Sequence, residues 1–262
     1  TIYDTITIIE PDSLFITYTT SNFSGFEIDC AGQNSGEINI QVNGGTVPFN
    51  HYLNGTLQNS YNLTNLTAGN YIDSIIDFNG CSNSIIITLY EPDTLNGSLT
   101  STQLDCYGDC DGEIYSNING GVLPYNLQWN NGDTSDSITG ICDGSYNLSI
   151  TDENGCNENL TISLSEPDEL TSTYTKSDVS CFNANDGSAI VNFFGGTTGN
   201  ISGDTNYILG WQGLTTVLFN PVAQFETSLA SPNGIPAGIY PYTVTDLNGC
   251  TIYDTITIIE PD

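Results

Sequence analysis

Cysteines and carboxylates are the residues of this chain whose spacing could support chemistry. Its 262 residues include eight cysteines and 31 acidic residues, with one histidine, His51, and one basic residue, Lys176. Thiols form disulfides or bind zinc, whereas carboxylates bind calcium or act as general acids and bases. Because each of these uses needs its own spacing, the positions of the residues decide among them.

Six of the eight cysteines follow a repeated pattern. A first cysteine lies 14 residues before a Gly-Gly pair three times, and a second cysteine directly follows an Asn-Gly pair three times. The first cysteines are Cys30, Cys106 and Cys181, and the second cysteines are Cys81, Cys156 and Cys250. Their separations of about 50 residues, the absence of any Cys-x-x-Cys and the single histidine disfavour zinc.

One disulfide is therefore expected within each unit of the pattern. The expected pairs are Cys30–Cys81, Cys106–Cys156 and Cys181–Cys250, together with Cys110–Cys142, whose members occur only in the second unit. Closing a loop of this length stabilises a small domain by up to about 4 kcal/mol in the chain-entropy model. Disulfides also indicate an oxidising compartment outside the cytoplasm.

The carboxylates give a weaker signal. The segment from Asp109 through Asp111 to Glu113 resembles a fragment of a calcium loop, with alternating carboxylates and a glycine. The corresponding segments of the other units keep the glycine and lose most carboxylates, which favours a turn before a strand and leaves calcium as the minority alternative. With His51 expected at the surface of a variable loop, we expect no catalytic site, no enzyme activity and no other cofactor.

A tandem array must position these residues. The dodecapeptide at residues 1–12 recurs unchanged at residues 251–262, and Glu-Pro-Asp closes successive units at 10–12, 91–93, 166–168 and 260–262. We therefore expect residues 1–12 to be the last strand of a preceding repeat. Repeat 1 then spans 13–93, repeat 2 spans 94–168, and repeat 3 spans 169–262 with an insertion at about 197–236.

The units are expected to be all-β. Apolar residues alternate with polar ones in segments such as 38–42 and 160–164, which is the period of a half-buried strand. Asn-Gly supplies the positive φ angles of a tight hairpin turn. Several short strands in about 80 residues are typical of an immunoglobulin-like antiparallel β-sandwich, and three in series would form an extended rod.

The net charge restricts the partners. A formal charge of −30 excludes nucleic acid and anionic membrane surfaces, because both are polyanionic. No apolar run approaches the roughly 20 residues of a membrane-spanning helix, so no membrane insertion of this segment is expected.

The insertion in repeat 3 is a candidate contact surface. From Tyr207 to Pro236 it contains one acidic residue, and we predict a low-charge contact loop that includes Tyr207, Trp211, Phe219 and Phe225. The alternative is a lengthened hairpin that packs on its own domain or on a neighbouring one.

The combined signature is sharpest in repeat 2. It consists of Cys-Tyr-Gly-Asp-Cys-Asp-Gly (106–112), Gly-Gly-Val-Leu-Pro-Tyr (120–125), Trp129, Gly-Ser-Tyr (144–146), Thr-Asp-Glu-Asn-Gly-Cys (151–156) and Glu-Pro-Asp (166–168). This signature closely resembles the SprB repeat, found in giant cell-surface adhesins of gliding Bacteroidetes. Repeat 1 departs from it by carrying His51-Tyr52-Leu53 in the Trp129 region, and repeat 3 departs by its insertion and by lacking the Pro-aromatic pair.

The resemblance implies an extracellular array at the cell surface, secreted by the type IX route and serving gliding motility. Implied partners are neighbouring repeats, external surfaces or polysaccharides and, through other parts of the protein, the motility machinery. Asp-Ser/Thr-aliphatic triplets also look like the O-glycosylation signal of this phylum, with chance as the alternative. The acceptors would be Thr5, Ser13, Ser74, Thr94, Ser137 and Thr255.

The expected function is therefore a non-enzymatic, structural and adhesive repeat segment of a giant filamentous adhesin. It would act in gliding motility and attachment through many weak contacts. The alternatives are an array of carbohydrate-binding modules, and a passive stalk or sheath with adhesion located elsewhere.

Overall fold

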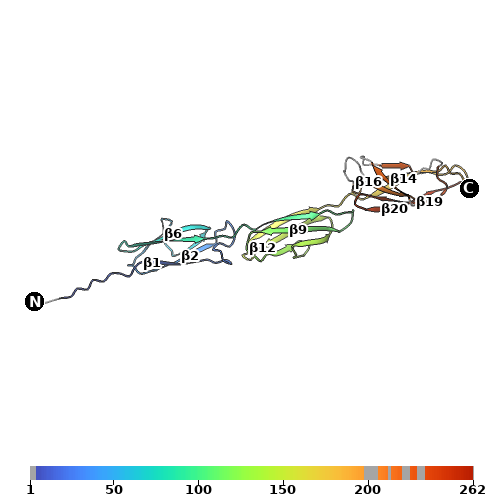
Figure 1. Ribbon diagram of the computed structural model, residues 1–262. Helices are drawn as coiled ribbons and strands as arrows, with labels where there is room; N and C mark the ends of the chain where they lie inside the picture. Colours follow the sequence, from blue (N-terminus) through green and yellow to red (C-terminus); the bar gives the residue numbers. More distant parts are fainter. Residues whose placement is uncertain (1–3, 198–205, 212–213, 220–224, 229–233, 262) are drawn as a thin grey trace. The chain divides into compact units, whose positions relative to one another are not determined.

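The computed structural model describes residues 4–197, 206–211, 214–219, 225–228 and 234–261, and the elements within them are β-strands (Figure 1). In all three repeats, the pairings whose register the structure gives are antiparallel. The predicted all-β antiparallel fold is thus confirmed. No helix among the described residues has the length and apolar character of a membrane span.

Repeat 1 is a sandwich of two sheets. One sheet has the order β1 (Phe15–Thr20), β2 (Gly36–Asn43), β5 (Asn62–Leu66). The other has the order β4 (Thr56–Gln58), β3 (Asn50–Leu53), β6 (Gly69–Ile76), β7 (Ser82–Leu89). Ile38 and Ile40 of β2 share one buried core with Ile75 and Ile87 of the second sheet, as the alternation of apolar residues predicts.

Repeat 2 contains two three-stranded sheets. One has the order β11 (Ser137–Ile141), β9 (Gly112–Asn119), β8 (Asn96–Thr102). The other has the order β10 (Asn126–Trp129), β12 (Gly144–Thr151), β13 (Asn157–Leu164). Trp129 is fully buried, and its indole N–H donates to the Ser135 carbonyl oxygen at 2.9 Å, so the aromatic of the repeat signature is a core residue.

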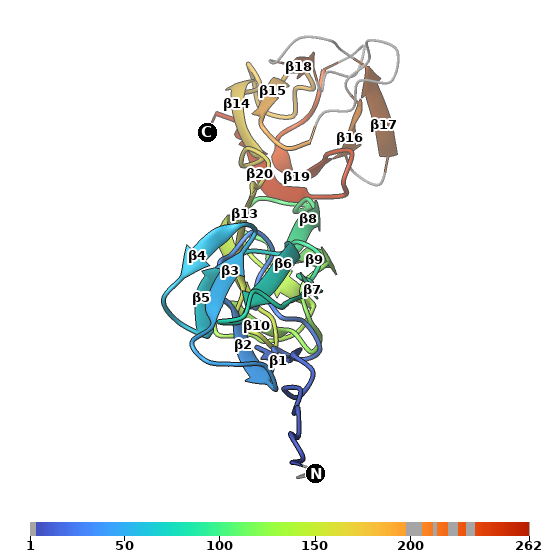
Figure 2. The ribbon, with the colours of Figure 1, turned by 90° about the vertical axis from the view of Figure 1, so that its left-hand side faces the viewer.

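Repeat 3 has the same two-sheet plan. One sheet has the order β14 (Thr171–Ser177), β15 (Ser188–Phe194), β18 (Phe225–Ser228). In the other, β16 (Asn206–Trp211) lies between β17 (Leu214–Phe219) and β19 (Gly238–Thr245), and β20 (Thr251–Ile258) follows β19 (Figure 2). Phe193, Val244 and Ile256 are fully buried in the core that these sheets share.

The chain divides into two compact units whose border runs through repeat 2. The first unit is Thr1–Ser98, Ser116–Asp136 and Asn147–Leu160, and the second is Leu99–Tyr115, Ser137–Tyr146 and Thr161–Asp262. The passage from repeat 1 to repeat 2 therefore lies inside the first unit, and the passage from repeat 2 to repeat 3 lies inside the second.

The Gly-Gly pair recurs because the chain crossing lies directly against it. The first glycine of each pair has a positive φ, +72° at Gly120, and a Cβ there would lie 1.9 Å from the Thr94 carbonyl oxygen. The second glycine donates its backbone N–H to the carbonyl oxygen of the Asp that ends Glu-Pro-Asp, as from Gly121 to Asp93 at 2.8 Å. Only glycine satisfies both the conformation and the close approach.

Candidate functional site: the covalent junctions between repeats

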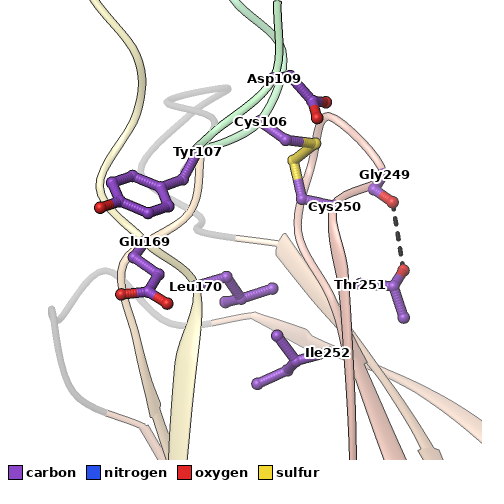
Figure 3. Close-up of a pocket in the computed structure, with 9 residues that line it drawn as sticks. All are labelled: Cys106, Tyr107, Asp109, Glu169, Leu170, Gly249, Cys250, Thr251 and Ile252. Carbon is purple, nitrogen blue, oxygen red and sulfur yellow. Dashed lines mark hydrogen bonds between the residues drawn. A yellow bond between two sulfur atoms is a disulfide. The ribbon is translucent and has the colours of Figure 1, made fainter.

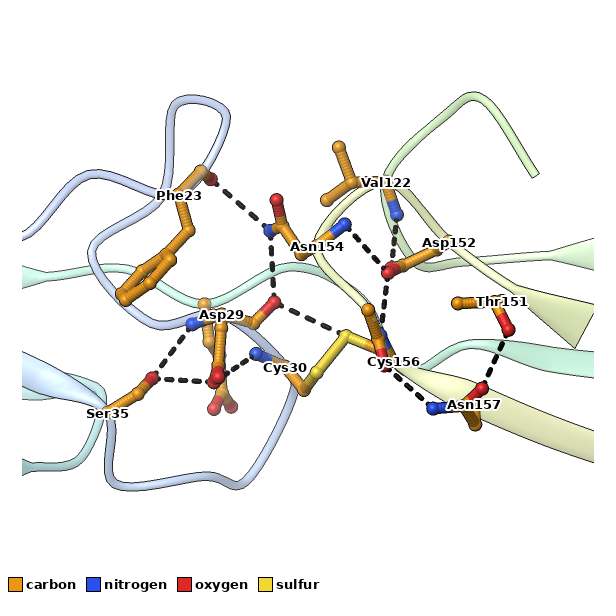
Figure 4. The surroundings of a disulfide bond; sticks show 12 residues. Phe23, Asp29, Cys30, Ser35, Val122, Thr151, Asp152, Asn154, Cys156 and Asn157 are labelled. Carbon is orange, nitrogen blue, oxygen red and sulfur yellow. Dashed lines mark hydrogen bonds between the residues drawn. A yellow bond between two sulfur atoms is a disulfide. The ribbon is translucent and has the colours of Figure 1, made fainter. Parts of the chain in front are cut away.

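The disulfides join different repeats. Cys30 of repeat 1 is bonded to Cys156 of repeat 2 (Figure 4), and Cys106 of repeat 2 is bonded to Cys250 of repeat 3 (Figure 3). The Cα–Cα distance is 5.7 Å in both, within the usual range for a disulfide. The first cysteines of repeats 1 and 2 are thus each bonded to the second cysteine of the following repeat, and we call these two bonds the junction disulfides.

The predicted pairs within single repeats, Cys30–Cys81, Cys106–Cys156 and Cys181–Cys250, are therefore wrong. Cys81 and Cys181 instead carry free thiols and are exposed. Cys110 and Cys142 are bonded to each other within repeat 2, as their occurrence in that repeat alone predicts.

The positions of the turns explain why the predicted pairs do not form. Cys81 precedes β7, whereas the turn after Cys30 is held by Glu91, just beyond the end of β7. A strand of eight residues spans about 26 Å at about 3.3 Å per residue, far beyond the reach of a disulfide. The two cysteines of one repeat thus lie at opposite ends of it, and the end with the first cysteine meets the end of the next repeat with the second cysteine.

A buried aspartate holds the turn that carries the second cysteine. In repeat 2 the Asp152 carboxylate accepts the backbone N–H groups of Cys156 at 2.9 Å, Asn154 at 3.0 Å and Val122 at 2.8 Å (Figure 4). An aspartate precedes each second cysteine by four residues. These three aspartates, Asp77, Asp152 and Asp246, are each at most 5% exposed. The carboxylate therefore links the cysteine turn to the segment after Gly-Gly.

These hydrogen bonds change the acidity of Asp77. Partial desolvation alone would raise its pKa, but hydrogen bonds from three backbone N–H groups and the Cys81 thiol hold the pKa below its usual value. A lowered pKa stabilises the folded state above the pKa of the unfolded chain, and this contribution is lost as the pH falls through the folded value.

A glutamate holds the turn that carries the first cysteine. In repeat 1 the Glu91 carboxylate accepts the backbone N–H of Gly32, two residues after Cys30, at 2.7 Å. Glu166 does the same for Gly108 at 2.7 Å, and Glu260 for Asn183 at 3.1 Å. Gly32, Gly108 and Asn183 all have positive φ, so the glutamate of Glu-Pro-Asp fixes a left-handed turn beside the cysteine.

An asparagine amide crosses each junction beside the disulfide. Asn154 Nδ2 of repeat 2 donates to the carbonyl oxygens of Asp29 at 3.0 Å and Phe23 at 3.3 Å in repeat 1 (Figure 4). Asn248 Nδ2 of repeat 3 likewise donates to the Asp105 carbonyl oxygen of repeat 2 at 2.9 Å. Asp29 and Asp105, which directly precede the bonded first cysteines, thus each accept a hydrogen bond from the turn that carries the partner cysteine of the disulfide.

Each junction disulfide lines an open pocket. At the junction of repeats 2 and 3, Cys106 and Cys250 line a cavity of about 440 Å³ with Tyr107, Glu169 and Leu170 (Figure 3). At the junction of repeats 1 and 2, Cys30 and Cys156 line a cavity of about 390 Å³. The linings of the two pockets correspond. Leu95 in the second pocket and Leu170 in the first each lie two residues after Glu-Pro-Asp.

His51 is buried, so its prediction as a surface residue is wrong. It is 3% exposed, its Nδ1 lies 3.0 Å from the Ser60 carbonyl oxygen, and its ring stacks on Tyr61. Its Nε2 lies 2.5 Å from Oδ2 of Asp73, whose Oδ1 has no hydrogen-bond partner among the described residues. Burial raises the pKa of Asp73, although His51 opposes this. Because both nitrogens and the face of the His51 ring are occupied by these contacts, His51 and Asp73 form a buried structural pair in repeat 1.

The calcium candidates lie in and after the first-cysteine turn of repeat 2. Asp109 and Asp111 are exposed, and Asp111 Oδ1 accepts the Asp105 backbone N–H at 3.3 Å. Glu113 in β9 accepts the Tyr115 hydroxyl. Over the described ranges of the chain, no three His, Cys, Asp or Glu side chains lie together as metal ligands would.

The candidate contact residues separate into two groups. Tyr207 is 8% exposed, donates its hydroxyl to the Gly195 carbonyl oxygen and packs edge-on against Phe193, so it belongs to the core and not to a contact loop. The side chains of Trp211, Phe219 and Phe225 lie outside the described residues. The backbone of these three residues belongs to β16, β17 and β18.

The glycosylation candidates differ in exposure. Thr5, Ser13, Thr94 and Thr255 are exposed, and Ser74 and Ser137 are half-buried.

Sequence comparison finds the family through three segments. The SprB repeat model matches residues 27–56, 98–134 and 173–202, one segment in each repeat. No match is found among curated proteins.

Solved structures of tandem-domain proteins are similar at low identity. The central fibronectin-III array of RIM-binding protein is 12% identical, with 87% of this chain and 93% of that chain covered and a TM-score of 0.23. A tetra-tandem repeat in the extending region of a large adhesion protein is 15% identical, with 95% and 75% covered and a TM-score of 0.28. A Ca²⁺-stabilized adhesin that helps an Antarctic bacterium bind ice is 16% identical, with 91% and 72% covered and a TM-score of 0.30.

Similarity to these structures at such values says nothing about what this chain binds. The first cysteines and the Gly-Gly pairs, in contrast, lie in the segments matched by the family model, and the structure gives them the same turns in each repeat. The chain therefore carries three SprB repeats.

Proposed function

We propose that this chain is a structural and adhesive segment of a giant filamentous cell-surface adhesin, serving gliding motility and surface attachment through multivalent contact. Three SprB repeats and three disulfides support a place outside the cytoplasm. The segment would reach the surface by type IX secretion and would contact external surfaces or polysaccharides. Other parts of the protein would contact the motility machinery.

The observation that carries this proposal is that disulfides connect successive repeats. A filament that attaches a moving cell to a surface is under tension, and tension extends a chain along its shortest covalent path. With the three disulfides intact, the path between the ends of this chain includes only residues 1–30, 142–156, 106–110 and 250–262. The two cysteine-to-cysteine regions of repeats 1 and 3 lie outside the path.

The gain in resistance to extension is large. At about 3.4 Å per residue, the fully extended chain would measure about 220 Å with the disulfides and about 900 Å without them. Repeats that lose their native packing under load would therefore lengthen the filament only slightly. Such a limit is useful to an adhesin that transmits force and unnecessary for an enzyme.

Multivalent contact is the second part of the proposal. Linked weak sites reinforce one another because the first contact raises the effective concentration of the next. The low-charge segment of repeat 3 between residues 207 and 236 is proposed, from its sequence, to contribute such contacts through side chains other than Tyr207. An extended rod of repeats would hold them away from the strongly anionic remainder of the chain.

The adhesive function is tested with beads that carry the chain at increasing density on glass and on polysaccharide-coated surfaces. We expect retention under flow to rise steeply with density, and to fall when residues 212–235 are shortened. The shortened variant keeps Cys250, so formation of its Cys106–Cys250 bond shows that repeat 3 still folds and serves as the control. Beads that are not retained at any density would contradict the adhesive role and favour a passive stalk, whereas saturable binding of one defined glycan by single chains would favour a carbohydrate-binding array.

A further inference from the structure

The two free thiols are the unpaired members of the same kind of junction. Cys81 is a second cysteine, which in the other repeats is bonded to the repeat before it, and Cys181 is a first cysteine, which in the other repeats is bonded to the repeat after it. The identical segments 1–12 and 251–262 set a period of 250 residues. In an array that continues with this period, the repeat that follows Cys181 would be another copy of repeat 1.

We infer that Cys181 of one copy of this sequence forms a disulfide with Cys81 of the next copy, which continues the junction disulfides without interruption along the array. The separation along such a chain would be 150 residues, close to the 126 and 144 residues of the two junction disulfides. This inference rests on the geometry of the junctions and does not require the chain to be adhesive.

The turn around Cys81 is already built as in a bonded junction. Asp77 Oδ1 accepts the backbone N–H groups of Cys81 at 2.8 Å and Asn79 at 2.9 Å, and Asp77 Oδ2 accepts that of Thr46 at 3.0 Å. These are the bonds that Asp152 makes around the bonded Cys156. Asn79 is exposed and so placed to donate to a neighbouring repeat, as Asn154 does across the first junction.

The turn around Cys181 matches the other half of a bonded junction. Its carbonyl oxygen accepts the backbone N–H of Ala184 at 3.0 Å, as the Cys30 carbonyl oxygen accepts that of Gln33. Glu260 holds Asn183 in the left-handed conformation that Gly32 has beside Cys30. Neither half therefore needs to rearrange before the bond forms.

Exposed aromatic side chains flank both free thiols. Phe182 follows Cys181 and is 69% exposed, and Phe78 lies in the Cys81 turn and is 71% exposed. At the junction of repeats 2 and 3 the residue corresponding to Phe182 is Tyr107, which lines the pocket beside the disulfide. A junction between copies would place Phe182 beside the bond as Tyr107 is placed, which removes part of its apolar surface from water and favours formation of the bond.

The bond forms by thiol–disulfide exchange with a small disulfide oxidant such as oxidised glutathione. The thiolate of one cysteine attacks the oxidant and displaces one thiol, and the thiolate of the other cysteine then attacks the mixed disulfide and displaces the second. The two cysteines lose two protons and two electrons, and the oxidant is reduced to two thiols.

The test is a two-copy chain, residues 1–262 followed directly by residues 13–262, so that the shared dodecapeptide joins the copies without a foreign linker. Refolding takes place with oxidised and reduced glutathione, and the free thiols are alkylated after denaturation without reduction. A single copy is expected to have two free thiols. The two-copy chain is also expected to have two, because Cys181 of the first copy and Cys81 of the second are consumed.

Peptide mapping identifies the bond. After digestion at acidic residues, since the chain has a single lysine, mass spectrometry should find a Cys181 peptide joined to a Cys81 peptide, and the variant below shows which copy supplies Cys181. The matched control, C181S in the first copy only, should have three free thiols. Four free thiols in the unchanged two-copy chain, or a bond between any other two of these cysteines, would overturn the inference.

A second measurement uses separate chains and does not depend on how the two-copy chain folds. Single-copy C81S and C181S variants are mixed at equal concentration and oxidised. We expect the heterodimer to exceed the two homodimers together, because only the mixed pair matches a junction. A statistical mixture of heterodimers and homodimers would contradict the inference.

Discussion

The junction disulfides and the bond within repeat 2 differ in what they enclose. Cys30–Cys156 and Cys106–Cys250 span 126 and 144 residues and connect neighbouring repeats, whereas Cys110–Cys142 spans 32 residues inside one repeat. Once the two junction disulfides are formed, the covalent path between the ends of the chain includes residues 106–156. Cys110–Cys142 lies on this stretch and shortens it.

The additional cysteines of repeat 2 complement the junction disulfides. In the chain as described, repeat 2 is the one repeat whose two patterned cysteines are both bonded to neighbours, so the stretch between them transmits tension. A bond placed there removes most of the extensible length of that stretch. The same bond in repeat 1 or repeat 3 of this chain would lie outside the path.

Reduction of all three disulfides should have the largest effect. The maximum extension of a single chain pulled from its ends should rise from about 220 Å to about 900 Å, because every residue then lies on the path. Single-molecule force spectroscopy with and without a thiol reductant measures this change. An oxidised chain that extends to several hundred ångströms more than 220 Å would show that the bonds are not those described.

Removal of one junction disulfide should have an intermediate effect. C106S/C250S should raise the maximum oxidised extension to about 460 Å, and C30S/C156S should raise it to about 400 Å. The difference between the two variants follows from which residues return to the path. Equal extensions for both variants, or no change from the parent chain, would contradict the cross-repeat pairing.

Removal of the bond within repeat 2 should have a smaller effect. C110S/C142S should extend to about 320 Å in the oxidised state, because residues 111–141 return to the path. The measurement is again the maximum oxidised extension, and C81S, at a cysteine that forms no bond here, is the control and should extend as the parent does. If C110S/C142S also matched the parent, tension would not be transmitted through residues 106–156.

Removal of the junction amide should have the smallest effect. Asn154→Ala deletes two hydrogen bonds to repeat 1 while the disulfide remains, and we expect a loss of about 1–2 kcal/mol in the free energy of unfolding. Denaturant unfolding of the oxidised chain measures it. Asn79→Ala is the matched control, since Asn79 Nδ2 donates to Thr46 within its own repeat. An equal or greater loss for Asn79→Ala would show that the amide does not contribute across the junction.

Local pattern predicted some of the strands and turns of every repeat. Alternating apolar residues place Ile38 and Ile40 in β2, and Asn-Gly places the hairpin before β7, because period and turn chemistry are properties of short segments. The aspartate four residues before each second cysteine and the glutamate of Glu-Pro-Asp recur as regularly as the cysteines. Their recurrence was the available signal for the turns that hold the junction.

The disulfide pairing could not be read from spacing alone. In a tandem array, a bond within a repeat and a bond to the next repeat both pair one first cysteine with one second cysteine, so the sequence pattern is the same. The direction of the strands distinguishes them, because β7 carries the chain from the Cys81 turn to the end of the repeat where Cys30 lies. Tracing which turn lies at which end of the sandwich would have favoured the correct pairing.

The duplicated dodecapeptide shows a further limit of local pattern. In repeat 3 it forms β20, paired with β19, with Ile256 and Ile258 buried. The same residues at 4–12 form no strand, and Ile6 and Ile8 are 85% and 92% exposed. A strand of this sequence therefore depends on the neighbouring strand more than on its own propensity.

The Glu-Pro-Asp crossing has a consequence for how such an array can diversify. Its glutamate closes the turn beside the first cysteine of one repeat. The carbonyl oxygen of its aspartate accepts the backbone N–H of the second glycine of the Gly-Gly pair in the following repeat. Three consecutive residues thus set the geometry of both repeats where they meet. Repeat 3 has 19 more residues between its patterned cysteines than repeat 2, yet its cysteine turns are the same. New loops can thus be inserted or exchanged in the middle of any module while every module remains interchangeable at its connectors.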